Sequence, residues 1–136
     1  MVASMTCDGK FLNQKTGYSV IFDDDGRVAY AYLLAPDEHI VSDVWLYNRC
    51  ESPLQPEWPD QEKIPFANPA SYSKSHSGFL GVSNISDVSV EWEDDEEAKV
   101  SIFIRGNLFA ILSAGCKPGW CFMAKQNGPL AKTLES

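Results

Sequence analysis

The sequence predicts an all-β fold, or a β-rich fold with minor helix, arranged as an antiparallel sandwich or small barrel of six to seven strands. Short segments rich in β-branched and aromatic residues recur between turn signals, and they group into two three-stranded meanders. No segment has the length and period of a helix. With 136 residues, 44% of them hydrophobic, the chain is expected to form one domain over residues 1–136.

The first meander is predicted from strands at residues 18–22, 28–34 and 40–47. Asp23-Asp24-Asp25-Gly26 joins the first two, and Gly26 can supply the positive φ that closes a hairpin. We expect this loop to pair Phe22 with Val28. Pro36 marks the second connection, because proline fixes φ and cannot donate to a ladder.

Residues 48–84 form a proline-rich segment in which regular structure is not expected, since prolines recur at 53, 56, 59, 65 and 69. A long irregular stretch in a small domain is usually a covering or functional loop. This one carries large apolar side chains, including Trp58 and Phe66, which need something to pack against. We therefore expect the segment to lie over a face of the first sheet.

The second meander is predicted from strands at residues 88–93, 100–104 and 108–112. Gly106-Asn107 is predicted to be a two-residue hairpin loop that pairs Ile104 with Phe109. Residues 120–125 are predicted to be either a short final strand or one turn of helix.

The charge and the ends of the chain restrict the partners and the compartment. A net charge of -8 and a pI near 4.6 argue against nucleic acid and anionic membranes, and they favour basic partners as well as solubility. No apolar run is long enough to span a bilayer, and residues 1–10 lack the features of a signal peptide. We expect a cytoplasmic protein whose four cysteines are free thiols.

The most informative feature is the third predicted strand. Alternation places four of its residues on one face: Asp43, Trp45, Tyr47 and Arg49. Tyr30 and Tyr32 extend that face from the neighbouring strand. Large aromatics combined with an acid and a base are typical of recognition surfaces.

Two interpretations of this face stay open. In one, the proline-rich segment covers it, so that Trp45 and Tyr47 belong to the core and Asp43 pairs with Arg49 at the rim. In the other, a ligand groove lies between sheet and loop, with Trp58 and Phe66 as its second wall.

Metal binding has only weak sequence support. Cys116 and Cys121 have a spacing seen in zinc sites, but no second close pair accompanies them. The run from Asp23 to Asp25 lacks the EF-hand spacing for calcium. We expect no cofactor and no resident metal.

Three function classes follow. The leading one is a non-enzymatic, acidic protein-interaction module, of inhibitor or immunity type, with a basic partner. The second is a small-molecule-binding β domain that uses the face around Trp45. The third is a small hydrolase or isomerase built on His39 or His76, although neither histidine lies in a catalytic motif. The oligomeric state stays open.

Overall fold

The structure, a computed structural model, describes residues 7–50, 52–60, 66–74, 82, 84–93 and 98–134. Its strands are β1 (Cys7–Leu12), β2 (Ser19–Asp24), β3 (Val28–Leu34), β4 (Ile40–Asn48), β5 (Val88–Trp92), β6 (Lys99–Ile104), β7 (Asn107–Ser113), β8 (Trp120–Cys121) and β9 (Lys132–Thr133). Two short 3-10 helices, η2 (Ala70–Tyr72) and η3 (Ile85–Asp87), are the only helices among these residues. The predicted β-rich class with minor helix is confirmed.

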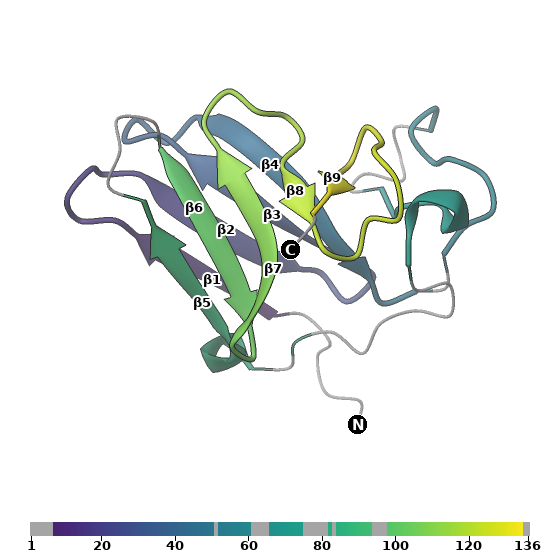
Figure 1. Cartoon of the computed structure of the whole chain (residues 1–136), viewed down its shortest axis with the longest axis horizontal. Helices are drawn as coiled ribbons and strands as arrows, with labels where there is room; N and C mark the ends of the chain where they lie inside the picture. Colours follow the sequence, from purple (N-terminus) through teal and green to yellow (C-terminus); the bar gives the residue numbers. More distant parts are fainter. Residues whose placement is uncertain are drawn as a thin grey trace.

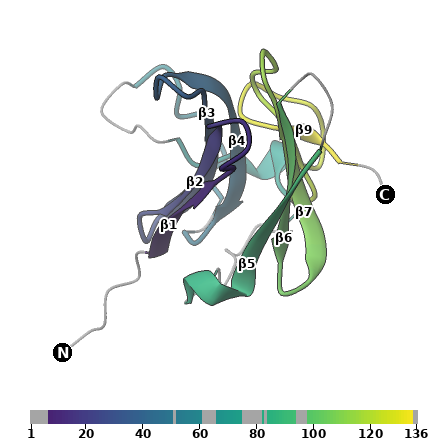
Figure 2. The ribbon, with the colours of Figure 1, turned by 90° about the vertical axis from the view of Figure 1, so that its left-hand side faces the viewer.

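The strands form two sheets, one with the order β1-β2-β3-β4 and one with the order β5-β6-β7-β8-β9 (Figure 1). All neighbouring strands are antiparallel except β8 and β9, which run parallel. Viewed from the side, the sheets are two separate layers (Figure 2). The described strands do not close into a single barrel.

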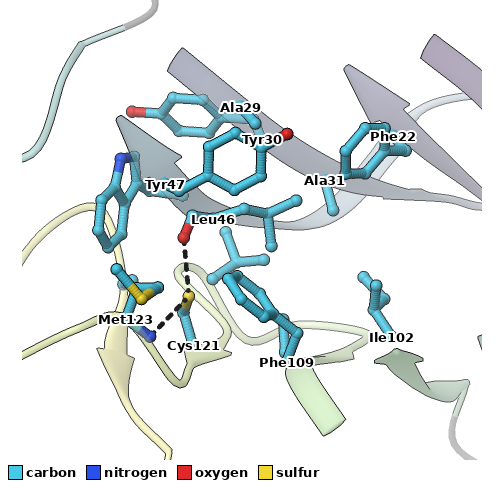
Figure 3. Packing of buried hydrophobic residues seen from close by; sticks show 14 of the residues in the cluster. Phe22, Ala29, Tyr30, Ala31, Leu46, Tyr47, Ile102, Phe109, Cys121 and Met123 are labelled. Carbon is cyan, nitrogen blue, oxygen red and sulfur yellow. Dashed lines mark hydrogen bonds between the residues drawn. The ribbon is translucent and has the colours of Figure 1, made fainter. Parts of the chain in front are cut away.

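One apolar core lies between the layers. Phe22 and Ala31 of the first sheet face Ile102 and Phe109 of the second (Figure 3). The Tyr47 and Phe109 rings meet edge to face, with centroids 6.3 Å apart. Such aromatic contacts add to the stabilisation from removing apolar surface from water.

The predicted pairing of Phe22 with Val28 is wrong, because β2 continues through Asp24 and Phe22 pairs with Ala31. The hairpin turns instead on Asp25, whose Oδ1 accepts hydrogen bonds from the backbone NH groups of Arg27 at 2.9 Å and Val28 at 3.0 Å. Because the Asp25 side chain accepts hydrogen bonds from the NH groups of the turn, the hairpin can close tightly. The strand ladder therefore extends further than the position of Gly26 alone predicts.

The predicted loop Gly106-Asn107 is also displaced. The turn residues are Arg105 and Gly106, both with positive φ, and Ile104 pairs with Asn107. Two consecutive positive φ values suit the turn to the twist of the strands.

Two parts of the sheets were not predicted: β1, and the contacts made by the C-terminal segment with the free edge of β4. The Val41 carbonyl accepts from Gly115, and the Asp43 carbonyl accepts from Gly119 at 2.7 Å. The Trp45 NH donates to the Leu130 carbonyl at 2.9 Å. The edge of the first sheet is thereby paired to residues that follow β7 in the chain, and this leaves the edge less available to another strand.

Candidate functional site

The outer face of the first sheet carries four of the predicted site residues together. Tyr32 lies directly opposite Asp43, and Tyr30 lies opposite Trp45. The Tyr30 and Tyr32 rings stack with centroids 6.1 Å apart and an interplanar angle of 11°. Sequence reasoning therefore placed these residues on a common face correctly in the sheet.

A β-bulge in β4 separates the other half of the predicted face. Tyr47 pairs with Ala29, but Trp45 pairs with Tyr30, so Leu46 is an extra residue in the ladder. A bulge of one residue reverses the alternation beyond it. Tyr47 and Arg49 consequently lie on the inner face of the sheet, away from Trp45 and Asp43.

On the inner face, Tyr47 and Arg49 both bind the buried carboxylate of Asp24. The Tyr47 hydroxyl donates to Asp24 Oδ2 at 2.5 Å, and Arg49 Nε lies 2.7 Å from the same oxygen. Val82 completes the network, since its NH donates to the Tyr47 hydroxyl at 3.0 Å and its carbonyl accepts from Arg49 at 2.7 Å. The predicted rim ion pair between Asp43 and Arg49 is therefore replaced by a buried pair between Asp24 and Arg49.

This network of hydrogen bonds around Asp24 stabilises the fold. Asp24 is completely buried, and burial raises the pKa of Tyr47 with help from its hydrogen bond to Asp24. A buried charge is tolerated when a partner and hydrogen bonds compensate its lost hydration. The network fixes Val82, near the end of the proline-rich segment, to the first sheet.

Trp45 is also completely buried, and its indole is satisfied within the protein. Its Nε1 donates to Asn48 Oδ1 at 2.8 Å, and Asn48 Oδ1 also accepts from the Asn68 NH at 2.9 Å. Asn48 Nδ2 donates to the Asn68 carbonyl at 2.9 Å. Asn68 is in this way hydrogen-bonded to the end of β4, and Trp45 is not accessible to a ligand.

The first part of the proline-rich segment is held by Glu57, which is almost fully buried. Glu57 Oε2 forms an ion pair with Arg27, and Glu57 Oε1 accepts from the Ala67 NH at 2.8 Å. The Tyr30 hydroxyl donates to the Phe66 carbonyl at 2.6 Å, and burial strongly raises the pKa of Tyr30. Tyr30 is therefore engaged by the chain itself.

The two loop aromatics proposed as a second wall lie apart from Trp45 in their ring contacts. Trp58 meets Tyr72 edge to face, with ring centroids 6.1 Å apart. Phe66 contributes its backbone carbonyl to Tyr30, as described above. This geometry does not support a ligand groove above Trp45.

What stays accessible on the outer face is a half-buried patch centred on Tyr32. Tyr32 lies opposite Asp43 in the sheet. Burial raises the pKa of Tyr32 to about 12, and the charges of Asp23, Asp43 and Asp25 contribute to this rise. Burial also raises the pKa of Asp43, and Lys117 opposes that rise. We call Tyr32, Asp23, Asp25 and Asp43 the acidic Tyr32 patch.

Apolar side chains border this patch at the end of the sheet. Leu12 and Ile40 stand at the two ends of one row that crosses all four strands. They are 55% and 44% exposed. Neither residue was predicted on this face. Leu12 belongs to β1, which was not predicted, and a second register shift in β4 leaves Val41 out of the pairing and turns Ile40 outward, although regular alternation puts it in the core.

Cys116 and Cys121 do not form a metal site with other described residues. Cys121 is buried, its Sγ lies 3.2 Å from the Leu46 carbonyl, and burial raises the pKa of its thiol to about 12. Cys116 is half-exposed and uses its carbonyl to accept from the Ser42 hydroxyl. No group of three or more histidine, cysteine, aspartate or glutamate residues that could hold a metal exists in the described ranges.

The predicted histidines provide no catalytic arrangement in the described part of the chain. His39 is 63% exposed in its side chain and contacts Asp37, two residues away in the same turn. His76 lies outside the described residues. A local contact of this kind stabilises a turn.

None of the helices in the described ranges has the length and hydrophobicity needed to cross a bilayer. No protein-family model, curated protein or solved structure matches this chain.

Proposed function

We propose that this protein is a non-enzymatic binding module, of inhibitor or immunity type, that engages a basic protein partner through the acidic Tyr32 patch. The observation that carries the proposal is that the half-buried Tyr32 lies directly opposite Asp43 on the outer face of the first sheet. The negative charges of Asp23, Asp43 and Asp25 also act on the Tyr32 hydroxyl, because they contribute to its raised pKa.

This arrangement suits a lysine or arginine side chain of a partner. A cation is attracted to the face of a tyrosine ring, and a carboxylate beside the ring adds a charged acceptor. In the described part of the chain, Lys10 lies 3.5 Å from Glu38, and Lys117 interacts with Asp43. With a net charge of -8, the chain also favours encounter with basic surfaces at a distance.

The exposed Leu12 and Ile40 supply contact area next to the charges. Protein interfaces usually combine an apolar or aromatic centre with a polar rim, and the rim sets orientation. The scaffold proposed for this surface is a two-layer β-sandwich. Its rigid outer face, with side chains fixed by the ladder, limits the entropy lost on binding.

A cytoplasmic location is part of the proposal. Cys50, Cys116 and Cys121 are free thiols. Free thiols are typical of a reducing compartment.

A capture experiment with matched variants tests the proposal. The wild-type full chain is immobilised and exposed to cell extract at low salt. It is compared with the double variant Asp23→Asn/Asp43→Asn. The control is Asp87→Asn/Glu91→Gln, which removes the same amount of negative charge near β5. We expect a basic protein that is retained by the wild type and the control but lost by the patch variant. Equal retention by all three proteins, or retention of no basic protein, would refute it.

A further inference from the structure

A concave surface lies on the outer face of the second sheet, β5-β6-β7-β8-β9. A cavity of about 460 Å³ opens there, and the residues that matter for its chemistry are Lys99, Ile111, Trp120, Asn127, Lys132 and Thr133. Ligand sites of small molecules commonly have volumes of roughly 300–1,000 Å³. The cavity is thus of suitable size for a small organic ligand.

The residues at the floor of the cavity lie in one row across the strands of the sheet. Ser101 pairs with Ile111, Ile111 pairs with Trp120, and Trp120 pairs with Lys132, so these side chains share a face. Their inward neighbours in the sequence, Leu112 and Cys121, are completely buried. The row therefore lies outside the core, where Trp120 offers an apolar ring surface beside Ile111.

Two lysines, Lys99 and Lys132, lie in the walls of the cavity. Lys132 Nζ stands 5.0 Å from the centroid of the Trp120 ring, and no carboxylate in the described ranges lies within ion-pair distance of it. Lys99 Nζ is 4.0 Å from Glu93 Oε1, and both side chains are about half-exposed. A pair so long and so exposed to water holds Lys99 weakly.

Asn127 adds a directed donor. Its Oδ1 accepts from the Thr133 NH at 2.9 Å and from the Thr133 hydroxyl at 3.2 Å. Because these bonds occupy the oxygen, the amide orientation is fixed and the Nδ2 group is the part left to donate to a ligand.

From these contacts we infer that the cavity binds a small planar organic anion, an aromatic ring that carries a carboxylate. The ring packs on Trp120 and Ile111, and the carboxylate lies between Lys99 and Lys132 with Asn127 as a further donor. Aromatic packing and charge-assisted hydrogen bonds are both stronger in such a partly enclosed site than on an open surface. The site is independent of the acidic Tyr32 patch, which lies on the other sheet and prefers cations.

The probe is 2-naphthoate, titrated into the full chain and followed by ¹H–¹⁵N NMR. We expect saturable shifts at the Trp120 indole NH and at the backbone of Lys132 and Thr133. 2-Naphthalenemethanol, which lacks the charge, and acetate, which lacks the ring, should each bind at least about fivefold more weakly.

Charge variants give the sharper test. Lys132→Gln should weaken 2-naphthoate binding about three- to fivefold, and Glu93→Gln should tighten it about twofold by releasing Lys99. Lys125→Gln removes the same charge from an exposed lysine that does not line the cavity, so it should leave binding unchanged. Every variant must keep the dispersed spectrum of the folded protein.

Three results would each overturn the inference: no saturable shifts with 2-naphthoate, shifts located away from Trp120, or equal weakening by Lys132→Gln and Lys125→Gln.

Discussion

The Tyr47 hydroxyl donates a 2.5 Å hydrogen bond to the buried carboxylate of Asp24, joining β4 to the last residue of β2. The same hydroxyl accepts from the Val82 NH, so one oxygen links the first sheet to the end of the proline-rich segment. Burial of both partners makes this contact important for stability, because neither can exchange it for water.

Tyr47→Phe should therefore destabilise the fold by about 1–3 kcal/mol, since it leaves the buried Val82 NH without its acceptor. Urea denaturation measures this change as a lower midpoint with an unchanged slope. Tyr18→Phe is the control, because Tyr18 is half-buried and its hydroxyl has no hydrogen bond within the described residues. A loss no larger than that of Tyr18→Phe would contradict the network.

Asp24→Asn should cost about 3 kcal/mol or more, because it leaves the buried guanidinium of Arg49 without its anionic partner. Adding Arg49→Met should recover part of this loss, since the pair is then replaced by groups that need no compensating charge. A double-mutant cycle from denaturation curves measures the coupling. Additive losses would show that the two residues act independently.

Asp43→Asn should instead stabilise the fold at pH 7. Burial raises the pKa of Asp43 above its usual value of roughly 3.9, so the ionised form is penalised in the folded state. Protonation of Asp43 therefore favours the folded state. This stabilisation is fully present below the pKa of the unfolded chain, and it is lost as the pH rises through the pKa of the folded protein.

Denaturation midpoints at pH 7 and pH 3 check this sign. The gain from Asp43→Asn should be present at pH 7 and shrink toward pH 3, where Asp43 is protonated in both states. A variant that is less stable than the wild type at pH 7 would show that Asp43 supports the fold, and would weaken its assignment to a binding surface.

Cys121 should resist alkylation by iodoacetamide at pH 8, because its thiol is buried and its pKa is raised to about 12. Half-exposed Cys116 should react in the same sample, and both should react in denaturant. Peptide mass mapping distinguishes the two sites. Modification of Cys121 in the folded protein would contradict its position in the core.

Much of the fold could be predicted from local pattern. The strands near residues 28–34 and 100–104 were found because β-branched and aromatic residues alternate there between turns. β1 was missed because its sequence, CDGKFL, contains glycine and charge and pairs only as an edge strand. The strand alternative for residues 120–125 is correct only at Trp120–Cys121, which forms β8, and β9 was missed because it has only two residues.

The site was harder, because one residue decides which side chains share a face. The extra Leu46 in β4 moves Tyr47 and Arg49 inward, and no local signal in the sequence distinguishes a bulge there from a regular strand. The partner of Arg49 could not be predicted for the same reason. Asp24 was taken as a hairpin residue, whereas its side chain is buried beneath the sheet.

The most direct test of the proposed function is a titration of the full chain with a lysine- and arginine-rich peptide, followed residue by residue by NMR. Wild type is compared with Asp23→Asn/Asp43→Asn and with Asp87→Asn/Glu91→Gln, which carries the same charge. Tyr32→Leu is added because it keeps apolar volume but removes the ring that attracts a cation.

We predict saturable shifts around Tyr32 and Asp43 that weaken with salt, are reduced severalfold by the patch variant and by Tyr32→Leu, and persist in the control. Shifts spread evenly over the acidic residues of both sheets, with equal loss in the patch and control variants, would contradict the proposal that the Tyr32 patch is a binding site.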